Sequence, residues 1–310
     1  MPQDDDSATQ PQPLAPGLYL VATPIGNLED ITLRALRVLK SADRIACEDT
    51  RQTQKLLNYY GIITPTVSLH EHNEAGRTSE LIADLLGGER IAVVSDAGTP
   101  GISDPGMFLT RAAIKAEIPV FPVPGANAGL SALIASGLDV DRFLFVGFLP
   151  PKTSARRGDL EKLKAGLNQP STLIFYEAPH RIVETLADVE RVWGASCQVV
   201  VARELTKLHE EFLRGTVAEI REQLAGRDRV RGEIVLLVDA QPASAEDVGM
   251  VSVQQRIHEL KEAEGVDEMD ALKRIARERG VSKSEVYREL QRERRTDRPG
   301  GRNFDAKSSG

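Results

Sequence analysis

An apolar segment that runs directly into a polar loop rich in glycine and proline is the feature that most constrains how this chain can fold. The clearest example is Ile-Ala-Val-Val at residues 91–94, followed at 95–106 by Ser-Asp-Ala-Gly-Thr-Pro-Gly-Ile-Ser-Asp-Pro-Gly. The apolar run predicts a buried strand, and a helix is expected at about 107–116. Because ligands of parallel α/β sheets bind at the carboxyl ends of strands, residues 95–100 are interpreted as a ligand loop. Asp104 and Pro105 have the residue types of a helix N-cap and first helical position.

The same pattern recurs along the chain. Six further polar loops follow short apolar segments, at residues 23–27, 48–51, 70–74, 124–128, 177–181 and 203–207. Helix-like periodicity separates most of these units, so repeated strand–helix pairs are expected. The sequence therefore predicts an α/β fold in which parallel strands end in polar residues at one edge of a sheet.

The expected organisation has two α/β domains, a helical domain and two tails. The tails are residues 1–16, which are acidic and rich in Gln and Pro, and residues 294–310. The α/β domains are expected at 17–148 and 149–240, because a basic linker at about 149–157 interrupts the pattern. Only helices are predicted at 246–293, where the turn at 279–284, with Gly280 and a serine at cap positions, suits a helix-turn-helix.

The distribution of charge points to one polyanion-facing region. The 310 residues include 39 Lys and Arg and 46 Asp and Glu, a net charge of −7 that excludes a uniformly basic nucleic-acid binder. Residues 271–310 nevertheless carry 12 basic and 6 acidic residues, or +6, which leaves −13 for the rest of the chain. This segment is either a surface that faces a polyanion or a solvated helical cap.

Several common motifs are absent from the sequence. It has no G-x-G-x-x-G, no Gly-Lys of a phosphate-binding loop and no C-x-x-C. His70-Glu71-His72 has metal-binding residue types, but no third ligand is evident and no metal is expected. Cys47 and Cys197 lie in apolar segments and are expected to be buried thiols. Without a signal-like or membrane-spanning segment, a cytoplasmic location is expected.

Six ordered motifs together resemble one known family. They are Thr-Pro-Ile-Gly-Asn-Leu at 23–28, Glu-Asp-Thr-Arg at 48–51, His-Glu-His-Asn-Glu at 70–74, the loop at 95–106, Phe-Tyr-Glu-Ala-Pro-His-Arg at 175–181 and Ala-Arg-Glu-Leu-Thr-Lys at 202–207. In this order they resemble the ribosomal RNA small subunit methyltransferase I family of the tetrapyrrole methylase superfamily. The resemblance covers about residues 17–240.

The resemblance implies an S-adenosylmethionine-dependent enzyme that methylates a cytidine ribose 2′-oxygen in the decoding region of 16S rRNA. It also implies two α/β domains with the cofactor in the cleft between them, and a homodimer. By position, the cofactor contacts of the superfamily fall on Ile25, Asp96, Thr99, Asn127 and Ala128 in the first domain, and near Phe175, Tyr176, Arg203 and Glu233 in the second.

Methyl transfer to a ribose hydroxyl requires alignment of donor and acceptor and a base or cation near the attacking oxygen. The candidates at strand exits are His70, His180 and three residues that we select: Asp49, Glu177 and Lys207. Each could instead be a helix cap or a structural ion pair. Phosphate contacts are expected from Lys152, Arg156 and Arg157 in the linker and from Lys283 and Arg288 in the tail.

Two other functions remain open on sequence alone. The same fold could methylate a tetrapyrrole or another small molecule, although the basic linker favours RNA. A regulator that binds nucleic acid through its helical tail is a different class, and it would not need the loops described above.

Overall fold

The computed structural model describes residues 13–70, 73–103, 106–242, 253–278 and 281–296. The chain divides into two compact units, one of residues 1–162 and 170–240 and the other of residues 163–169 and 241–310. Within the described ranges, no helix is both long enough and apolar enough to cross a membrane.

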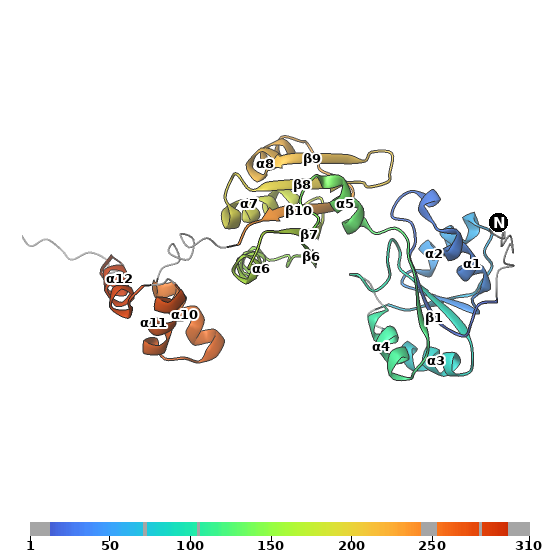
Figure 1. The fold of residues 1–310 in the computed structure, drawn as a ribbon. Helices are drawn as coiled ribbons and strands as arrows, with labels where there is room; N and C mark the ends of the chain where they lie inside the picture. The colour runs from blue at the N-terminus through green and yellow to red at the C-terminus, as the bar shows by residue number, and fades with distance from the viewer. Residues whose placement is uncertain (1–12, 71–72, 104–105, 243–252, 279–280, 297–310) are drawn as a thin grey trace, which may run out of the picture. The chain divides into compact units, whose positions relative to one another are not determined.

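The first sheet, which contains the strand labelled β1 in Figure 1, consists of five parallel strands in the order β3-β2-β4-β1-β5. These strands are β1 (Gly17–Val21), β2 (Arg44–Cys47), β3 (Thr66–Ser68), β4 (Arg90–Val94) and β5 (Val120–Val123). Helices α1 (Leu33–Ser41) and α2 (Thr50–Tyr59) cover one face, and α3 (Glu74–Leu86) and α4 (Met107–Lys115) cover the other. Within β1, Leu18 packs with α3 and α4, whereas Tyr19 and Val21 pack with α1 and α2. Burial of both faces explains the continuous apolar runs, and the predicted parallel sheet is confirmed.

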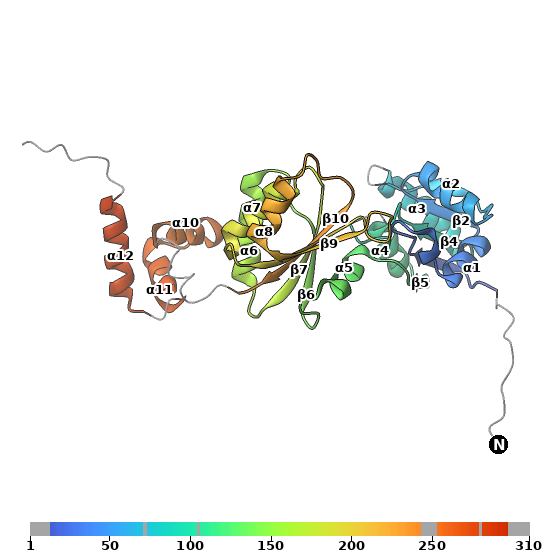
Figure 2. The same ribbon diagram turned by 90° about the horizontal axis from the view of Figure 1, so that it is seen from above.

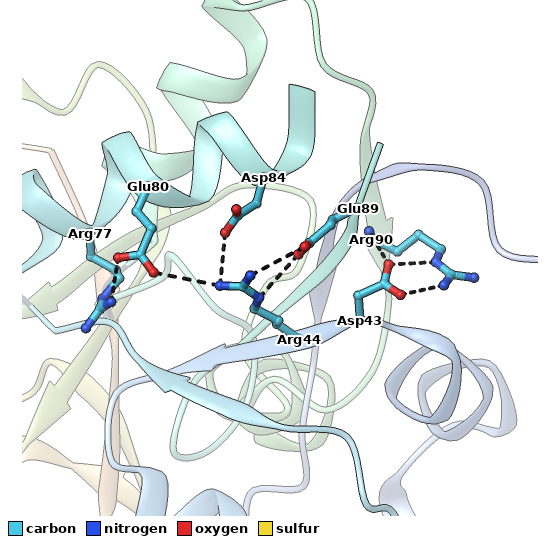
Figure 3. A network of polar contacts seen from close by, with 7 residues as sticks. All are labelled: Asp43, Arg44, Arg77, Glu80, Asp84, Glu89 and Arg90. Atoms are coloured by element: carbon cyan, nitrogen blue, oxygen red, sulfur yellow. Dashed lines mark hydrogen bonds and ion pairs between the residues drawn. The ribbon is translucent and has the colours of Figure 1, made fainter. Parts of the chain in front are cut away.

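A network of charged side chains lies at the amino ends of β2 and β4 (Figure 3). Arg44 Nη1 lies 3.0 Å from Asp84 Oδ2, and Arg44 Nε lies 3.3 Å from Glu89 Oε2. Next to it, Arg90 Nη2 lies 2.5 Å from Asp43 Oδ1, and the Arg90 main-chain N–H donates to Asp43 Oδ2 at 2.8 Å. The Arg90 side-chain hydrogen bond outweighs desolvation and holds the pKa of Asp43 below its usual value. The network joins the ends of the strands opposite to the polar loops, so its role is structural.

The second sheet is mixed, with the order β6-β7-β10-β8-β9. Its strands are β6 (Phe143–Phe148), β7 (Ser171–Glu177), β8 (Gln198–Arg203), β9 (Glu211–Thr216) and β10 (Ile234–Ala240). Only β6 and β7 are parallel neighbours, whereas β10 runs antiparallel to both β7 and β8, and β9 runs antiparallel to β8. Helices α6 (Thr153–Gly166), α7 (Ile182–Trp193) and α8 (Val217–Ala225) lie on one side and α5 (Ala128–Ser136) on the other (Figure 2).

Two elements that precede the predicted domain boundary at 148/149 belong to the second sheet. Strand β6 pairs with β7, and Ala132 and Leu133 of α5 pack against Ile174 and Val200. The structure therefore moves the change of sheet to the segment between β5 and α5. The run Phe-Leu-Phe-Val-Gly-Phe at 143–148 was not predicted as a strand, because the prolines that follow it suggested a linker.

The described part of the C-terminal unit contains three helices, α10 (Val253–Glu264), α11 (Glu268–Glu278) and α12 (Lys283–Thr296). Their apolar faces share a core that includes Ile257, Leu272 and Val286. A capping box begins α12: the Glu285 N–H donates to Ser282 Oγ, and the Ser282 N–H donates to Glu285 Oε2. Gly280 of the predicted turn lies outside the described residues. Helix α12 continues to residue 296, past the predicted start of the tail at 294.

Candidate functional site

A cavity of about 350 Å³ lies where the polar loops of both sheets meet within the first compact unit. It is bounded by the loops that follow β1, β4, β5, β7 and β8, by the end of β6, and by the start of β10. Its lining is Ile25, Asp96, Ala97, Gly98, Thr99, Ile102, Ser103, Asn127, Ala128, Phe148, Tyr176, Glu177, Ala178, Pro179, Leu205, Gly232, Glu233, Ile234 and Val235. The loops at the carboxyl ends of the first sheet, which the sequence predicts to form a ligand edge, therefore line this cavity.

Hydrogen bonds from main-chain N–H groups and from side-chain hydroxyls hold the first-sheet wall of the cavity together. Thr23 and Gly98 form a two-bond bridge, with N–H to O distances of 2.8 and 3.0 Å. Ser95 Oγ donates to the Gly98 carbonyl at 3.2 Å, and Thr99 Oγ1 donates to the Ala126 carbonyl at 3.2 Å. These bonds fix the loops after β1, β4 and β5 to one another, so the wall is preorganised by neutral groups.

The helices behind this wall begin with specific caps. Asn127 caps α5, since its Oδ1 accepts from the Leu130 N–H at 3.0 Å. Helix α4 is capped from outside its own sequence: the buried Glu74 of α3 accepts from the Gly106 and Phe108 N–H groups at 3.0 and 3.2 Å. A carboxylate suits a helix N-terminus both as an acceptor and as a negative charge. The predicted cap residues Asp104 and Pro105 lie outside the described residues.

Aromatic side chains form part of the second-sheet wall. The Tyr176 ring packs edge-on against Phe145, with centroids 5.1 Å apart, and against Phe148, with centroids 5.6 Å apart. Phe148 is exposed and, like Tyr176, lines the cavity. An aromatic face next to a cavity is favourable for a bound cation such as a sulfonium.

Glu177 is buried in this wall with both carboxylate oxygens engaged. Its Oε2 accepts from Thr185 Oγ1 at 2.6 Å, and its Oε1 accepts from the Ala178 N–H at 2.8 Å. Arg181 Nε lies 3.4 Å from Oε1. Hydrogen bonds and an ion pair thus compensate for burial of this carboxyl group, whose residue is 3% exposed.

Lys207 forms a cluster of charged side chains with Glu204 and Glu233, and of these three residues only Glu233 lines the cavity. Lys207 Nζ lies 2.9 Å from both Glu204 Oε1 and Glu233 Oε2, and the Glu233 N–H donates to the same Glu204 oxygen at 3.0 Å. Burial favours a lower pKa for Lys207, but the hydrogen bonds to both carboxylates outweigh it and raise the pKa. Glu204 and Thr206 have positive φ angles of 52° and 64°, a rare conformation for a β-branched residue such as Thr206.

Asp49 is the N-cap of α2. Its Oδ1 accepts from the Arg51 N–H at 2.8 Å, and Arg51 Nη2 donates to its Oδ2 at 2.9 Å. The hydrogen bonds from Arg51 lower the pKa of Asp49 to about 2. Asp49 also donates its N–H to Asp96 Oδ1 at 3.2 Å, and so helps to orient an exposed carboxylate that does line the cavity.

Seven of the nine residues named for the cofactor line the cavity: Ile25, Asp96, Thr99, Asn127, Ala128, Tyr176 and Glu233. Phe175 does not line it, because side chains alternate along β7 and that of Phe175 is fully buried. Arg203 also lies outside the lining, where its Nε donates to Glu211 Oε2 at 3.0 Å. Of the three selected catalytic residues, Glu177 lines the cavity, whereas Asp49 and Lys207 touch lining residues. His180 is exposed beside the cavity, and His70 is not in the lining.

Phe148 and Gly232 line the cavity but lie outside the loops that the sequence predicts, whereas Ser103 and Leu205 lie in the predicted loops at 95–106 and 203–207. Gly232 precedes a strand, whereas the predicted ligand loops all follow strands. Because β10 is antiparallel, its first residue, Ile234, pairs with both Glu177 and Arg203 at the ends of β7 and β8. The signal available in the sequence was the Gly232-Glu233 pair directly before an apolar run.

The residues predicted to contact phosphate have different environments. Arg156 is 1% exposed, and its Nε donates to the equally buried Asp188 at 2.6 Å. Asp188 also accepts from Arg157 Nε at 2.5 Å, although Arg157 itself is half-exposed. This burial corrects the prediction for Arg156, which is a structural ion-pair residue joining α6 to α7. Lys152 is exposed.

In the C-terminal unit, Arg288 is exposed and Lys283 is half-buried. Among the described residues, no group of three or more His, Cys, Asp or Glu side chains could hold a metal ion. Glu71 and His72 of the sequence motif that was considered for metal binding lie outside the described residues. Cys47 is buried and Cys197 is partly buried, and in the described residues neither forms a disulfide.

Comparison with known proteins defines the class. The family model for tetrapyrrole (corrin/porphyrin) methylases matches residues 17–221. The fold is similar to that of a uroporphyrin-III C-methyl transferase from Thermus thermophilus, solved in complex with S-adenyl homocysteine, with a TM-score of 0.51 and 18% identity over 71% of this chain and 96% of that chain. The chain therefore has the fold of the tetrapyrrole methylases and carries their domain.

Comparison with curated relatives defines the family more narrowly. The ribosomal RNA small subunit methyltransferase I of Halalkalibacterium halodurans is 49% identical over 288 residues, which cover 92% of this chain and 95% of that protein. The protein of the same name from Bacillus subtilis is 45% identical over 274 residues, or 87% of this chain and 92% of that protein. The chain belongs to the ribosomal RNA small subunit methyltransferase I family, and it is a methyltransferase. The resemblance inferred from six motifs is confirmed.

Proposed function

We propose that this protein transfers a methyl group from S-adenosylmethionine to the 2′-oxygen of a cytidine in the decoding region of small-subunit ribosomal RNA. The observation that carries the proposal is the cavity itself, which gathers seven of the nine residues expected to contact the cofactor. The names of the relatives support a ribosomal RNA substrate. That substrate also supports a cytoplasmic location.

The residues of the cavity fit S-adenosylmethionine. The cofactor supplies an electrophilic methyl group on a positively charged sulfur. Asp96 offers an exposed carboxylate, Tyr176 offers an aromatic face, and the loop at 97–99 offers main-chain groups in fixed positions. Gly98 has a φ of +84°, and a Cβ there would lie 3.3 Å from Ile25 Cγ2, so the close approach of the two loops requires glycine.

We assign the three selected catalytic residues different parts in the reaction. Glu177 alone lines the cavity, so we place it nearest to the acceptor hydroxyl, where its carboxylate would orient the ribose or accept its proton. The raised pKa of Lys207 keeps it cationic, and it acts through Glu233. Asp49 is a weak base with its pKa of about 2, and it positions Asp96.

Two surfaces are proposed for the macromolecular contacts. Lys152, Arg157, Lys283 and Arg288 remain candidates for phosphate binding. A homodimer is supported by the apolar side chains at β6, an edge strand, where Phe143 and Leu144 are 46% and 44% exposed. Light scattering would measure the mass in solution, and a monomer at micromolar concentration would contradict the dimer.

The test of the function uses purified protein, S-adenosylmethionine labelled on the methyl group, and either free 16S rRNA or 30S subunits. Label in RNA, mapped to one cytidine ribose, is the expected result. Glu177→Gln should lower kcat while the calorimetric Kd for the cofactor stays within about twofold, because only the reacting groups are altered. Methylation of a base, or transfer only to a tetrapyrrole, would contradict the proposal.

A further inference from the structure

A second hollow, an open groove of about 690 Å³, lies directly beside the cavity. Pro179 and Gly232 line both spaces, so a molecule in the groove reaches the rim of the cavity. The groove is built entirely from the second-sheet part of the chain, between the start of α7 and the segment that joins α8 to β10.

The lining of the groove is strongly basic. The segment Arg-Asp-Arg-Val-Arg at 227–231 contributes three arginines and one acid, Asp228, and His180 adds an imidazole. His180, Arg229 and Arg231 are all exposed. In the described part of the chain, neither the Arg229 nor the Arg231 guanidinium has a hydrogen-bonding or ion-pair partner. A protein–RNA interface typically presents such unpaired arginines to phosphates.

The backbone that carries these arginines is anchored. Arg227 donates two hydrogen bonds to Glu211, at 2.7 and 2.9 Å, and Arg203 donates a third to the same carboxylate at 3.0 Å. Arg203 Nη1 also donates to the Arg231 carbonyl at 3.3 Å. Arg203 and Arg227 therefore fix the segment. Arg229 and Arg231 lie on this anchored backbone, and their guanidinium groups are unpaired within the described ranges.

The start of α7 adds a second source of positive potential. Arg181 occupies the N-cap position without a side-chain cap bond, and Val183 of the first turn lines the groove. Uncapped N–H groups at a helix N-terminus favour an anion. The groove therefore combines free guanidinium groups with a helix terminus on the same side of the cavity.

We propose that this groove binds the phosphates that flank the target ribose and thereby guides the ribose into the cavity. The inference rests on the proposed function, because the ligand is the RNA substrate. Arg229 and Arg231 would each contact one phosphate. Phosphate contacts position the substrate without reading its sequence, so they should affect RNA affinity and not the identity of the methylated nucleotide.

The test compares the wild type with the double variant Arg229→Gln/Arg231→Gln. A matched control, Arg111→Gln/Lys115→Gln, removes two exposed charges from α4. RNA affinity is measured over a range of salt concentrations, and the groove variant should lose about 0.7 in the salt slope for each contact removed. This corresponds to roughly 10–30-fold weaker binding near 0.1 M salt. Its KM for RNA should rise while kcat and cofactor Kd stay close to wild type.

The outcomes separate the two proposals. If the wild type does not methylate ribosomal RNA, the proposed function itself fails. If the wild type is active and the groove variant matches it in salt slope and KM, only the groove assignment is overturned. An equal loss in the α4 control would show a general effect of net charge, and would overturn the assignment as well.

Discussion

The two sheets build opposite walls of one cavity by different means. All five strands of the first sheet are parallel, so every loop that follows a strand lies at the same edge. In the second sheet β10 is antiparallel to its neighbours, and the segment that enters it joins the loops that leave β7 and β8. Polar residues that follow strands therefore mark the cavity wall in the first sheet, but only part of the wall in the second.

The walls also differ in what holds them. Neutral hydrogen bonds such as those between Thr23 and Gly98 fix the first wall. Ion pairs fix the second, through Lys207 with Glu204 and Glu233 and through Glu211 with two arginines. Since charge pairs respond to pH and salt and neutral hydrogen bonds respond much less, the two walls should respond differently to the same treatment.

The largest effect is expected from Gly232→Ala in the second wall. Gly232 has a φ of +89°, and a Cβ there would collide with the side chain of Glu204, which Lys207 holds in place. The control Gly137→Ala has a φ of +82° and open space around the new methyl group. Urea unfolding should show a loss of about 1–2 kcal/mol for the control. The loss for Gly232→Ala should be larger by about 1–3 kcal/mol. Equal losses in the two variants would mean that the Glu204 side chain moves aside for the added methyl group at little cost.

Asp96→Ala tests the first wall. Asp96 is exposed and lines the cavity, so its loss should weaken cofactor binding by roughly 10–100-fold, the range for one charge-assisted hydrogen bond. Asp141→Ala, which removes an exposed carboxylate outside the lining, is the control. Calorimetry measures Kd, and circular dichroism checks the fold. Wild-type affinity in Asp96→Ala would assign cofactor binding mainly to the second wall.

The ion pairs of the second wall predict that the stability of the fold decreases at acidic pH. Hydrogen bonds from Arg227, and then from Arg203, hold the pKa of Glu211 at about 2, below its ordinary 4.5. Its stabilising contribution is therefore complete above pH 4.5 and is lost as the pH falls towards 2. Glu211→Gln should cost roughly 1–2 kcal/mol at pH 7 and flatten the fall in stability below pH 4.5. An unchanged acid profile in the variant would contradict this role.

The smallest effect is expected at the amino ends of the first sheet. Asp43→Asn weakens the pair with Arg90 and should cost about 0.5–1 kcal/mol at low salt, and less at 1 M salt. Glu80→Gln, a more exposed member of the same network, is the control and should cost less (Figure 3). Cofactor Kd should be unchanged in both variants, since neither residue lines the cavity. A change in Kd would link the two ends of the sheet.

The sequence by itself determined the parallel first sheet, the loops at its ligand edge and the family. These features are local: an apolar run specifies a buried strand, and a glycine–proline loop after it specifies a turn. Within these loops the family resemblance implies cofactor contacts at Ile25, Asp96, Thr99, Asn127 and Ala128, and all five line the cavity.

Only the tertiary structure decided the rest. The direction of β10, the cap that Glu74 supplies to α4, and the burial of Arg156 against Asp188 each depend on a partner more than 30 residues away in the chain. The sequence of an isolated segment indicates whether it forms a strand and which charges it carries. It does not specify which neighbour it pairs with, because the free energy of that choice comes from burial and pairing across the whole fold.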